Sequence, residues 1–124
     1  MHIKDLAERA GVTVRAVRYY ESRGLVAPRR EPNGYRTYDD SDVHVVREVR
    51  ALLSLGMTAE ETHPFVECLR AGHERADVCP GSLSAYRRRI ADVDARIAEL
   101  TTLRGQLTHL LVEAEAYRTP KETA

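Results

Sequence analysis

Two cysteines and a histidine, Cys68, His73 and Cys79, lie within one twelve-residue stretch of this sequence. A pair of thiols can be oxidised reversibly to a disulfide, whereas thiolates together with an imidazole suit zinc, copper(I) or mercury. The spacing C-x10-C matches no tight zinc motif, so thiol oxidation is the first hypothesis and a metal site the second. A small ligand in a pocket is the third hypothesis. In the amphipathic segment FVECL, Cys68 can equally be a small buried apolar residue.

Cys79 is the more reactive candidate of the two thiols. It precedes the N-terminus of a predicted helix, and His73 and Arg75 are near it in the sequence. A helix N-terminus and neighbouring cations both favour the thiolate. A bond between Cys68 and Cys79 would join the end of one predicted helix to the start of the next, so we expect oxidation to fix that junction. In the metal alternative, His109 of a second copy can approach Cys79.

A second group of residues combines cations with an aromatic ring. Arg15, Arg18 and Tyr19 are spaced i, i+3 and i+4, which places them on one face of a helix. Arginine can hold a guanine or a phosphate through two hydrogen bonds, and tyrosine can reach a phosphate through its hydroxyl. Residues 1–38 carry eight Lys and Arg against four Asp and Glu, or +4, so the rest of this neutral chain carries −4. A basic N-terminal unit indicates an anionic partner.

Two short helices are predicted around these cations. Apolar residues at helical spacing favour a first helix over residues 3–10, which Gly11 ends. Thr13 is a favourable N-cap for a second helix over residues 14–23. The turn of three or four residues between them is typical of a helix-turn-helix, whose second helix usually enters the major groove of DNA.

A small β-hairpin is predicted to follow and to form a wing beside the second helix. Two prolines exclude a helix over residues 25–38, and Asn-Gly at 33–34 favours a two-residue type I′ turn. Tyr35 and Tyr38 flank Arg36 and are expected to face away from it, with at least one ring packed beneath the wing. The hairpin carries Arg29, Arg30 and Arg36, which are placed to hold the DNA backbone or the minor groove beside the second helix.

Two further helices are predicted downstream. Ser41 is the expected N-cap of a third helix. Thr58 and Glu61 form a capping box for a short fourth helix, and Pro64 inside that helix is expected to bend it or to shift its start. The segment 71–81 that follows has the composition of a loop.

One long helix dominates the C-terminal part of the sequence. No proline interrupts residues 82–114, and apolar residues recur every three or four positions, with an extra three-residue step that indicates a stammer. At ~1.5 Å per residue the helix is about 45–50 Å long, too long to fold back on residues 1–70. The apolar stripe therefore predicts a dimer formed with the same helix of a second copy. The expected dimer interface consists of Leu83, Tyr86, Ile90, Val93, Ile97, Leu100, Leu103, Leu107 and Leu110.

Short motifs occur in a fixed order within residues 2–70: RYYE, then GL, then P-x-R, then NGYR-x-Y. Together with VREVRALLSLGMTAEE they resemble the MerR family of bacterial transcription regulators. The resemblance implies a homodimer on a two-fold promoter operator, RNA polymerase as a partner, and activation by distortion of the DNA. Ala16 stands where members often have threonine. The DNA-contacting residues implied by the resemblance are Thr13, Arg15, Arg18, Tyr19, Arg36 and Tyr38.

The elements together predict a mainly α fold. A winged helix-turn-helix DNA-binding domain with a small hairpin wing precedes a long dimerisation helix, which is similar in kind to the antiparallel coiled coil of the MerR family. The expected divisions are a DNA-binding domain at 1–70, a linker loop at 71–81, a dimerisation helix at 82–116 and a disordered tail at 117–124.

Other classes of protein fit the sequence less well. No apolar run is long enough to span a bilayer, and the N-terminus lacks the apolar core of a signal peptide, so a cytoplasmic location without a membrane partner is expected. An iron–sulfur cluster needs four cysteine ligands, and the chain has two. No base accompanies either cysteine at a catalytic spacing, so enzymatic activity is not expected. An architectural DNA binder without an effector is a further rival, and the dimerisation helix argues against it.

Overall fold

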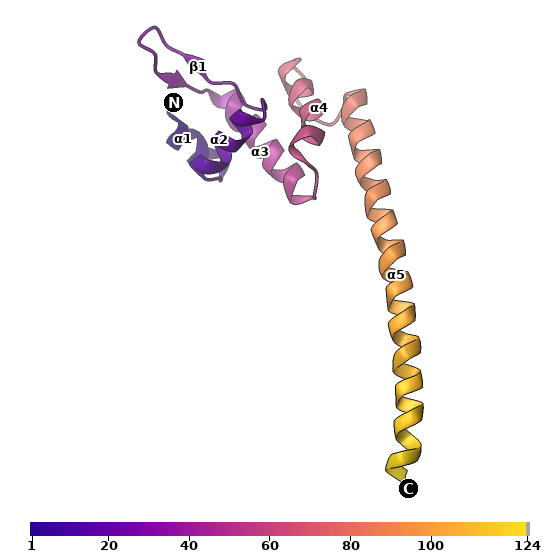
Figure 1. The fold of residues 1–124 in the computed structure, drawn as a ribbon. Helices are drawn as coiled ribbons and strands as arrows, with labels where there is room; N and C mark the ends of the chain where they lie inside the picture. Colours follow the sequence, from indigo (N-terminus) through magenta and orange to yellow (C-terminus); the bar gives the residue numbers. More distant parts are fainter. Residues whose placement is uncertain (124) are drawn as a thin grey trace. The chain divides into compact units, whose positions relative to one another are not determined.

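A computed structural model describes residues 1–123 of the chain, with side chains through residue 118, and shows five helices and one two-stranded hairpin (Figure 1). The expected mainly α fold with a small hairpin is confirmed. The chain divides into a first compact unit, Met1–Arg87, and a second unit that begins at Arg88. The elements are α1 (Ile3–Ala10), α2 (Val14–Ser22), β1 (Arg29–Arg30), β2 (Arg36–Thr37), α3 (Asp40–Ser54), α4 (Ala59–Arg70) and α5 (Pro80–Thr123).

The helix-turn-helix forms as the sequence predicts. Gly11 takes the left-handed conformation at φ 72° that ends α1, and Thr13 caps α2 by accepting a hydrogen bond from the backbone N–H of Ala16 at 3.0 Å. Val17 and Tyr20 bury the inner face of α2. The core of the first unit joins this face to α1, α3 and the wing, so α2 is held with its opposite face exposed.

The hairpin closes through a three-residue loop, and the expected two-residue type I′ turn is wrong. The N–H of Gly34 donates to Glu31 O, and the N–H of Glu31 donates to Tyr35 O, both at 2.8 Å. A type I′ turn needs positive φ at Asn33, but among the described residues only glycines have it. Pro32 presets a type I turn, and Gly34 at φ 86° follows as the bulge. The paired strand residues are Arg29 with Thr37 and Arg30 with Arg36.

Asp39, not the expected Ser41, caps α3. The Asp39 carboxylate accepts hydrogen bonds from the N–H groups of Ser41 at 3.0 Å and Asp42 at 3.3 Å, and Asp42 returns one by accepting from the Asp39 N–H at 2.9 Å. This reciprocal box starts the helix at Asp40. Arg29 of β1 pairs with Asp39 at 2.7 Å, so the same carboxylate joins the wing to α3.

The predicted capping box of α4 is confirmed. Thr58 accepts from the Glu61 N–H at 3.2 Å, and Glu61 accepts from the Thr58 N–H at 2.9 Å. The helix then runs without interruption from Ala59 to Arg70, with Pro64 inside it. The capping box therefore sets the start of α4, and Pro64 does not shift it.

The linker and the first turns of α5 belong to the first unit, so this unit extends past the expected boundary at residue 70. The rings of Phe65 and Tyr86 lie 5.0 Å apart, edge to face, and the hydroxyl of buried Ser82 donates to Ala76 O at 2.6 Å. The helix begins at Pro80, because proline suits the first helical position, where no helical partner exists for an N–H. Tyr86 therefore packs on its own chain and does not belong to the exposed stripe.

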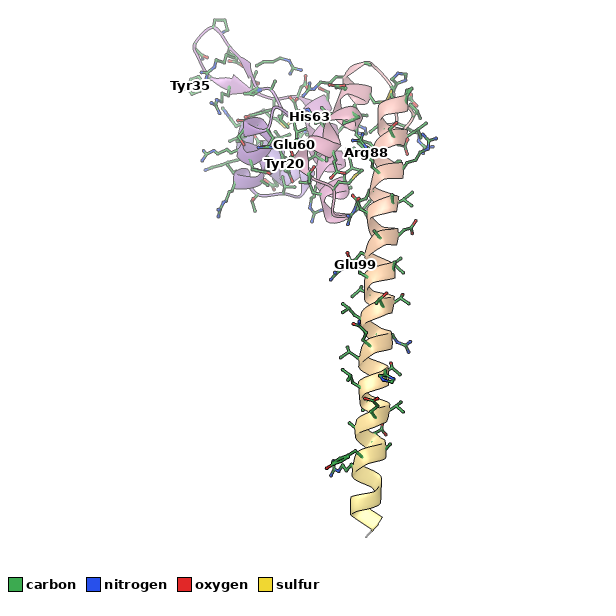
Figure 2. All side chains as sticks on the ribbon, turned by 45° about the vertical axis from the view of Figure 1, so that its right-hand side comes forward. Tyr20, Tyr35, Glu60, His63, Arg88 and Glu99 are labelled. Carbon is green, nitrogen blue, oxygen red and sulfur yellow. A yellow bond between two sulfur atoms is a disulfide. The ribbon has the colours of Figure 1, made fainter. Side chains whose placement is uncertain are left out.

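In the second unit, α5 is a single helix with its side chains in solvent (Figure 2). The remaining stripe residues, from Leu83 to Leu110, are between 40% and 66% exposed. The helix includes residues 117–123, where a disordered tail was expected, and residue 124 lies outside the described part. Within the described residues, none of the helices is long and apolar enough to cross a membrane.

Candidate nucleic-acid interface and thiol site

The outer face of α2 presents the side chains that the helical spacing predicts together. Arg15, Arg18 and Tyr19 are all exposed, with half of the Tyr19 surface accessible. Val17 and Tyr20 occupy the buried side of the same helix. The turn before α2 and the caps at its two ends fix this orientation, so the cations face outward.

A groove between α2 and the wing gathers cations from three elements. Its volume is about 430 Å³, and its lining includes Arg18 of α2, Arg30 of β1 and Arg36 of β2. Tyr35 also lines it and is 64% exposed on the wing (Figure 2). Three guanidinium groups around one groove favour an anion, and the phosphates of a DNA backbone supply anions at regular spacing.

Glu21, at the end of α2, holds the wing through two of its residues. Its carboxylate pairs with Arg36 at 3.2 Å and accepts a hydrogen bond from the Tyr38 hydroxyl. Tyr38 is 3% exposed, and burial followed by the hydrogen bond to Glu21 raises its pKa to about 12. Tyr38 therefore supports the wing and is not presented to DNA. Arg36 and Tyr38 both reach the Glu21 carboxylate, so the expectation that they face opposite ways is wrong.

Helix α4 anchors the C-terminal end of the recognition helix. The His63 ring nitrogen lies 3.0 Å from the carbonyl oxygen of Arg23, and the Arg23 guanidinium pairs with Glu60 (Figure 2). Helix α4 therefore holds both the backbone and the side chain of Arg23. At the last residue of α4, Arg70 donates to Leu25 O at 3.3 Å. A change in α4 therefore reaches the end of α2 directly.

Cys68 and Cys79 are joined by a disulfide, with their Cα atoms 5.9 Å apart. Cys68 is 2% exposed within α4, whereas Cys79 is half-buried at the residue before α5. The structure also brings His73 to them, since the donor atoms of the three residues all lie within 4.8 Å of one another. His109, the ligand considered from a second copy, pairs with Glu113 at 3.1 Å within its own helix.

The loop between α4 and α5 has supports besides the disulfide. The His73 N–H donates to Cys68 O at 3.4 Å, and Arg75 grips Asp77 through two hydrogen bonds of 2.9 Å. The Arg75 guanidinium holds the pKa of Asp77 below its usual range. Because Ser82 and Ala76 add a buried hydrogen bond, we expect the loop to keep its fold when the cysteines are reduced.

Comparisons with known proteins decide the family. Residues 1–65 match the family described as MerR HTH family regulatory protein, and residues 43–110 match the one described as MerR, DNA binding. The chain belongs to the MerR family. It is a DNA-binding transcriptional regulator, and the family consists of regulators rather than enzymes. The two matches together extend from the helix-turn-helix into α5.

Three relatives of this MerR-family chain cover most of its length. The transcriptional regulator HmrR of Rhizobium leguminosarum bv. viciae is 35% identical over 111 residues, which are 90% of this chain and 84% of HmrR. The regulator PbrR691 from Ralstonia metallidurans CH34 in complex with lead(II) is 29% identical, with a TM-score of 0.71, over 89% of this chain and 84% of that one. HiNmlR, a MerR-family regulator lacking the sensor domain and bound to promoter DNA, is 26% identical, with a TM-score of 0.56, over 82% and 75%.

The sequence motifs do not assign a role to Glu21, whereas Arg30 is expected, with Arg29 and Arg36, beside the second helix of the helix-turn-helix. The RYYE motif contains Glu21, but the motif alone does not show that its carboxylate meets the wing, because that contact forms only once the hairpin folds back. The structure places Arg30 opposite Arg36 in the hairpin and in the same groove as Arg18.

Glu21→Gln in this regulator is expected to raise its affinity for DNA of any sequence about 2- to 5-fold and to make the salt dependence of log K steeper by up to about one unit. Glutamine can still accept the Tyr38 hydrogen bond, but it no longer neutralises Arg36. Fluorescence anisotropy with random and promoter DNA across a salt series measures both changes. The matched control is Glu31→Gln, which removes an exposed wing carboxylate. Equal salt slopes for the two variants would contradict a role for Glu21 in holding Arg36.

Proposed function

We propose that this regulator acts as a homodimer on a two-fold promoter operator and that the thiol state of Cys68 and Cys79 sets its output. The observation that carries the proposal is the bond between these cysteines, which joins α4 to the start of α5. Helix α4 also anchors the end of the recognition helix. One covalent change thus acts between the part that contacts DNA and the helix that follows it.

Two features of α5 support an antiparallel homodimer. The stripe residues of the second unit are exposed in the single chain, and burying them against the same helix of a second copy removes that apolar surface from water. The helix also has a cluster of like charges near each end: Arg87, Arg88 and Arg89 precede Asp92 and Asp94 near its start, and Glu113 and Glu115 precede Arg118 near its end. Antiparallel pairing brings opposite charges together at both ends, whereas parallel pairing brings like charges together.

Binding to a two-fold operator follows from a two-fold dimer. Each copy supplies one recognition helix and one wing, and a dimer presents them to two half-sites in successive major grooves. Arg15, Arg18 and Tyr19 then face the groove, with Arg30 and Arg36 of the wing on the adjoining backbone. The family resemblance supports the remaining steps, which are distortion of the promoter DNA and use of the distorted promoter by RNA polymerase.

Oxidation supplies the signal in this proposal. Two thiols give two electrons and two protons to a hydroperoxide, whose oxygen–oxygen bond breaks to give an alcohol and water, and the sulfur–sulfur bond that forms fixes the end of α4 to the residue before α5. In the reduced protein this link is absent, while the hydrogen bonds of the loop remain. The two states therefore differ in how firmly α4 is held to the first turn of α5, and not in whether the unit is folded.

A thiophilic metal ion is the second candidate effector. Cys68, His73 and Cys79 offer two sulfurs and one nitrogen, a donor set that suits soft cations. Helix α4 places Cys68, the loop places His73, and Cys79 directly precedes α5, so the residues fit such an ion. When bound, the ion would supply a link between α4 and α5 that resembles the disulfide. The complex of the relative PbrR691 with lead(II) also favours this candidate.

The test compares the wild type with Cys68→Ser and Cys79→Ser. In the wild type, diamide followed by a reductant is expected to change operator affinity or promoter transcription reversibly by about 5-fold or more, within the usual range of allosteric coupling. Both variants are expected to show no response, because neither can form the bond. Free thiols are counted on the same samples. Loss of two thiols with unchanged DNA binding and transcription would overturn the redox proposal and favour an architectural DNA binder.

A further inference from the structure

We propose that Cys68, His73 and Cys79 form a complete thiophilic metal site within one chain, and that the bound ion and the disulfide exclude each other. The inference rests on the proposed function, because it names the regulation of the same thiols. The two candidate effectors are then not alternatives. They compete for one pair of sulfur atoms, and metal occupancy decides whether an oxidant can act.

The three donors are already near coordination distance of one another. Their ligand atoms lie within 4.8 Å, and all three residues belong to the first unit. Zinc binds sulfur at ~2.3 Å and imidazole nitrogen at ~2.0 Å, so the donors of a tetrahedral site are roughly 3.5 Å apart. His73 therefore needs little movement, and only the bond between Cys68 and Cys79 must open. No residue of a second copy is needed to complete these three ligands.

Exposure at the site is graded from one ligand to the next. Cys68 is buried, Cys79 is half-buried and His73 is exposed. The ion is thus reached from the His73 side, where a cavity of about 550 Å³ between α3, α4 and the loop is lined by His73, Glu74 and Arg70. Three protein ligands and one open position are typical of sites whose fourth ligand exchanges, in contrast to closed structural sites.

The arginines near the site are engaged by other groups, and Arg29, which also lines the cavity, pairs with Asp39 at 2.7 Å. Arg75, four residues before Cys79, is held by Asp77 through two hydrogen bonds of 2.9 Å. Glu74 adds a carboxylate next to His73 at the mouth of the cavity. Arg70 directs one of its nitrogens to Leu25 O at 3.3 Å, toward the end of the recognition helix.

The bound ion and the disulfide exclude each other because both use the same electron pairs of the two thiolate sulfurs. A metal ion needs both cysteines as thiolates. In the competing reaction two thiolates give two electrons to a hydroperoxide: the sulfur–sulfur bond forms, the oxygen–oxygen bond breaks, and two protons complete one alcohol and one water. Because the product has no thiolate, the ion is released. A bound ion therefore protects the dithiol, and oxidation empties the site.

The experiment uses reduced, full-length protein with Cd²⁺ as the probe, followed by ultraviolet thiolate-to-metal absorption. We expect one Cd²⁺ per chain. At about 100 times Kd, Cd²⁺ should slow disulfide formation by diamide about 100-fold, because only unbound protein reacts. Hydrogen peroxide added to the Cd²⁺ form should release the ion as two thiols are lost. A stoichiometry of half a Cd²⁺ per chain would overturn the inference. Cd²⁺ binding that leaves the rate of disulfide formation unchanged would also overturn it.

Two histidine variants locate the site. His73→Gln is expected to weaken Cd²⁺ binding by at least about 10-fold while leaving disulfide formation in metal-free protein unchanged. His109→Gln, the matched control on α5, is expected to bind as the wild type does. Equal binding by His73→Gln, or a loss confined to His109→Gln, would refute the single-chain site. A working diamide response with no Cd²⁺ binding defeats this inference alone, whereas a disulfide without effect on DNA binding defeats the proposed function.

Discussion

Replacing Ile97 with aspartate is expected to turn the dimer into a monomer and to weaken operator binding by about 100-fold or more. Ile97 stands in the middle of the α5 stripe and is 56% exposed in the single chain. In the proposed antiparallel pair it packs against the partner helix, where a buried and unpaired carboxylate is strongly unfavourable. A monomer also loses the second half-site, and linking two sites raises avidity by about 10²- to 10⁴-fold.

Sedimentation velocity and operator anisotropy on the same preparation test this expectation. The matched control is Ala95→Asp, which places the same charge on the exposed opposite face of α5 two residues earlier. We expect that control to remain dimeric and to bind DNA normally. An Ile97→Asp protein that sediments as a dimer would show that the stripe is not the interface.

Arg18→Ala is expected to weaken operator binding by more than about 10-fold and to make the salt dependence of log K shallower by about one unit. Arg18 belongs both to the outer face of α2 and to the groove beside the wing, where it meets Arg30 and Arg36. The substitution removes a contact to a base or a phosphate. Among the described residues that line this groove, α2 contributes no other cation to replace it.

The control for Arg18→Ala is Arg50→Ala, which removes an exposed arginine of α3 from outside the groove. Thermal unfolding should be unchanged in both variants, because neither side chain is buried. If both weaken binding equally, the effect reports net charge alone. Unchanged operator binding by Arg18→Ala at moderate salt would mean that α2 is not the recognition helix.

Features encoded by neighbouring residues could be predicted from the sequence. The shared face of Arg15, Arg18 and Tyr19 needs only the helical period, and the capping box at Thr58 and Glu61 needs only a spacing of three residues. Both signals involve a single turn of helix, so tertiary packing does not change them.

Features that depend on long-range contacts were missed or misjudged. The helical period places Tyr86 in the predicted dimer stripe. A period shows which residues share a helix face, but it does not show what packs against that face, and the Tyr86 ring packs on Phe65. The burial of Tyr38 against Glu21 follows from how the wing folds back on α2. The Asn-Gly signal was overridden by Pro32, which presets a different turn. The proximity of Cys68 and Cys79 likewise depends on the loop at residues 71–79, whose path the sequence does not specify.

The ion pair between Glu21 and Arg36 also bears on how quickly the regulator finds its promoter. A protein that scans a chromosome spends most of its time on wrong sites, and its dwell time on each rises with the number of free cations that hold the backbone. Since Arg36 is already neutralised before DNA arrives, each wrong encounter is shorter. A DNA site that also engages α2 holds the protein long enough for a phosphate to displace Glu21 from Arg36. The ion pair therefore lowers the affinity for DNA somewhat and shortens the search for the promoter.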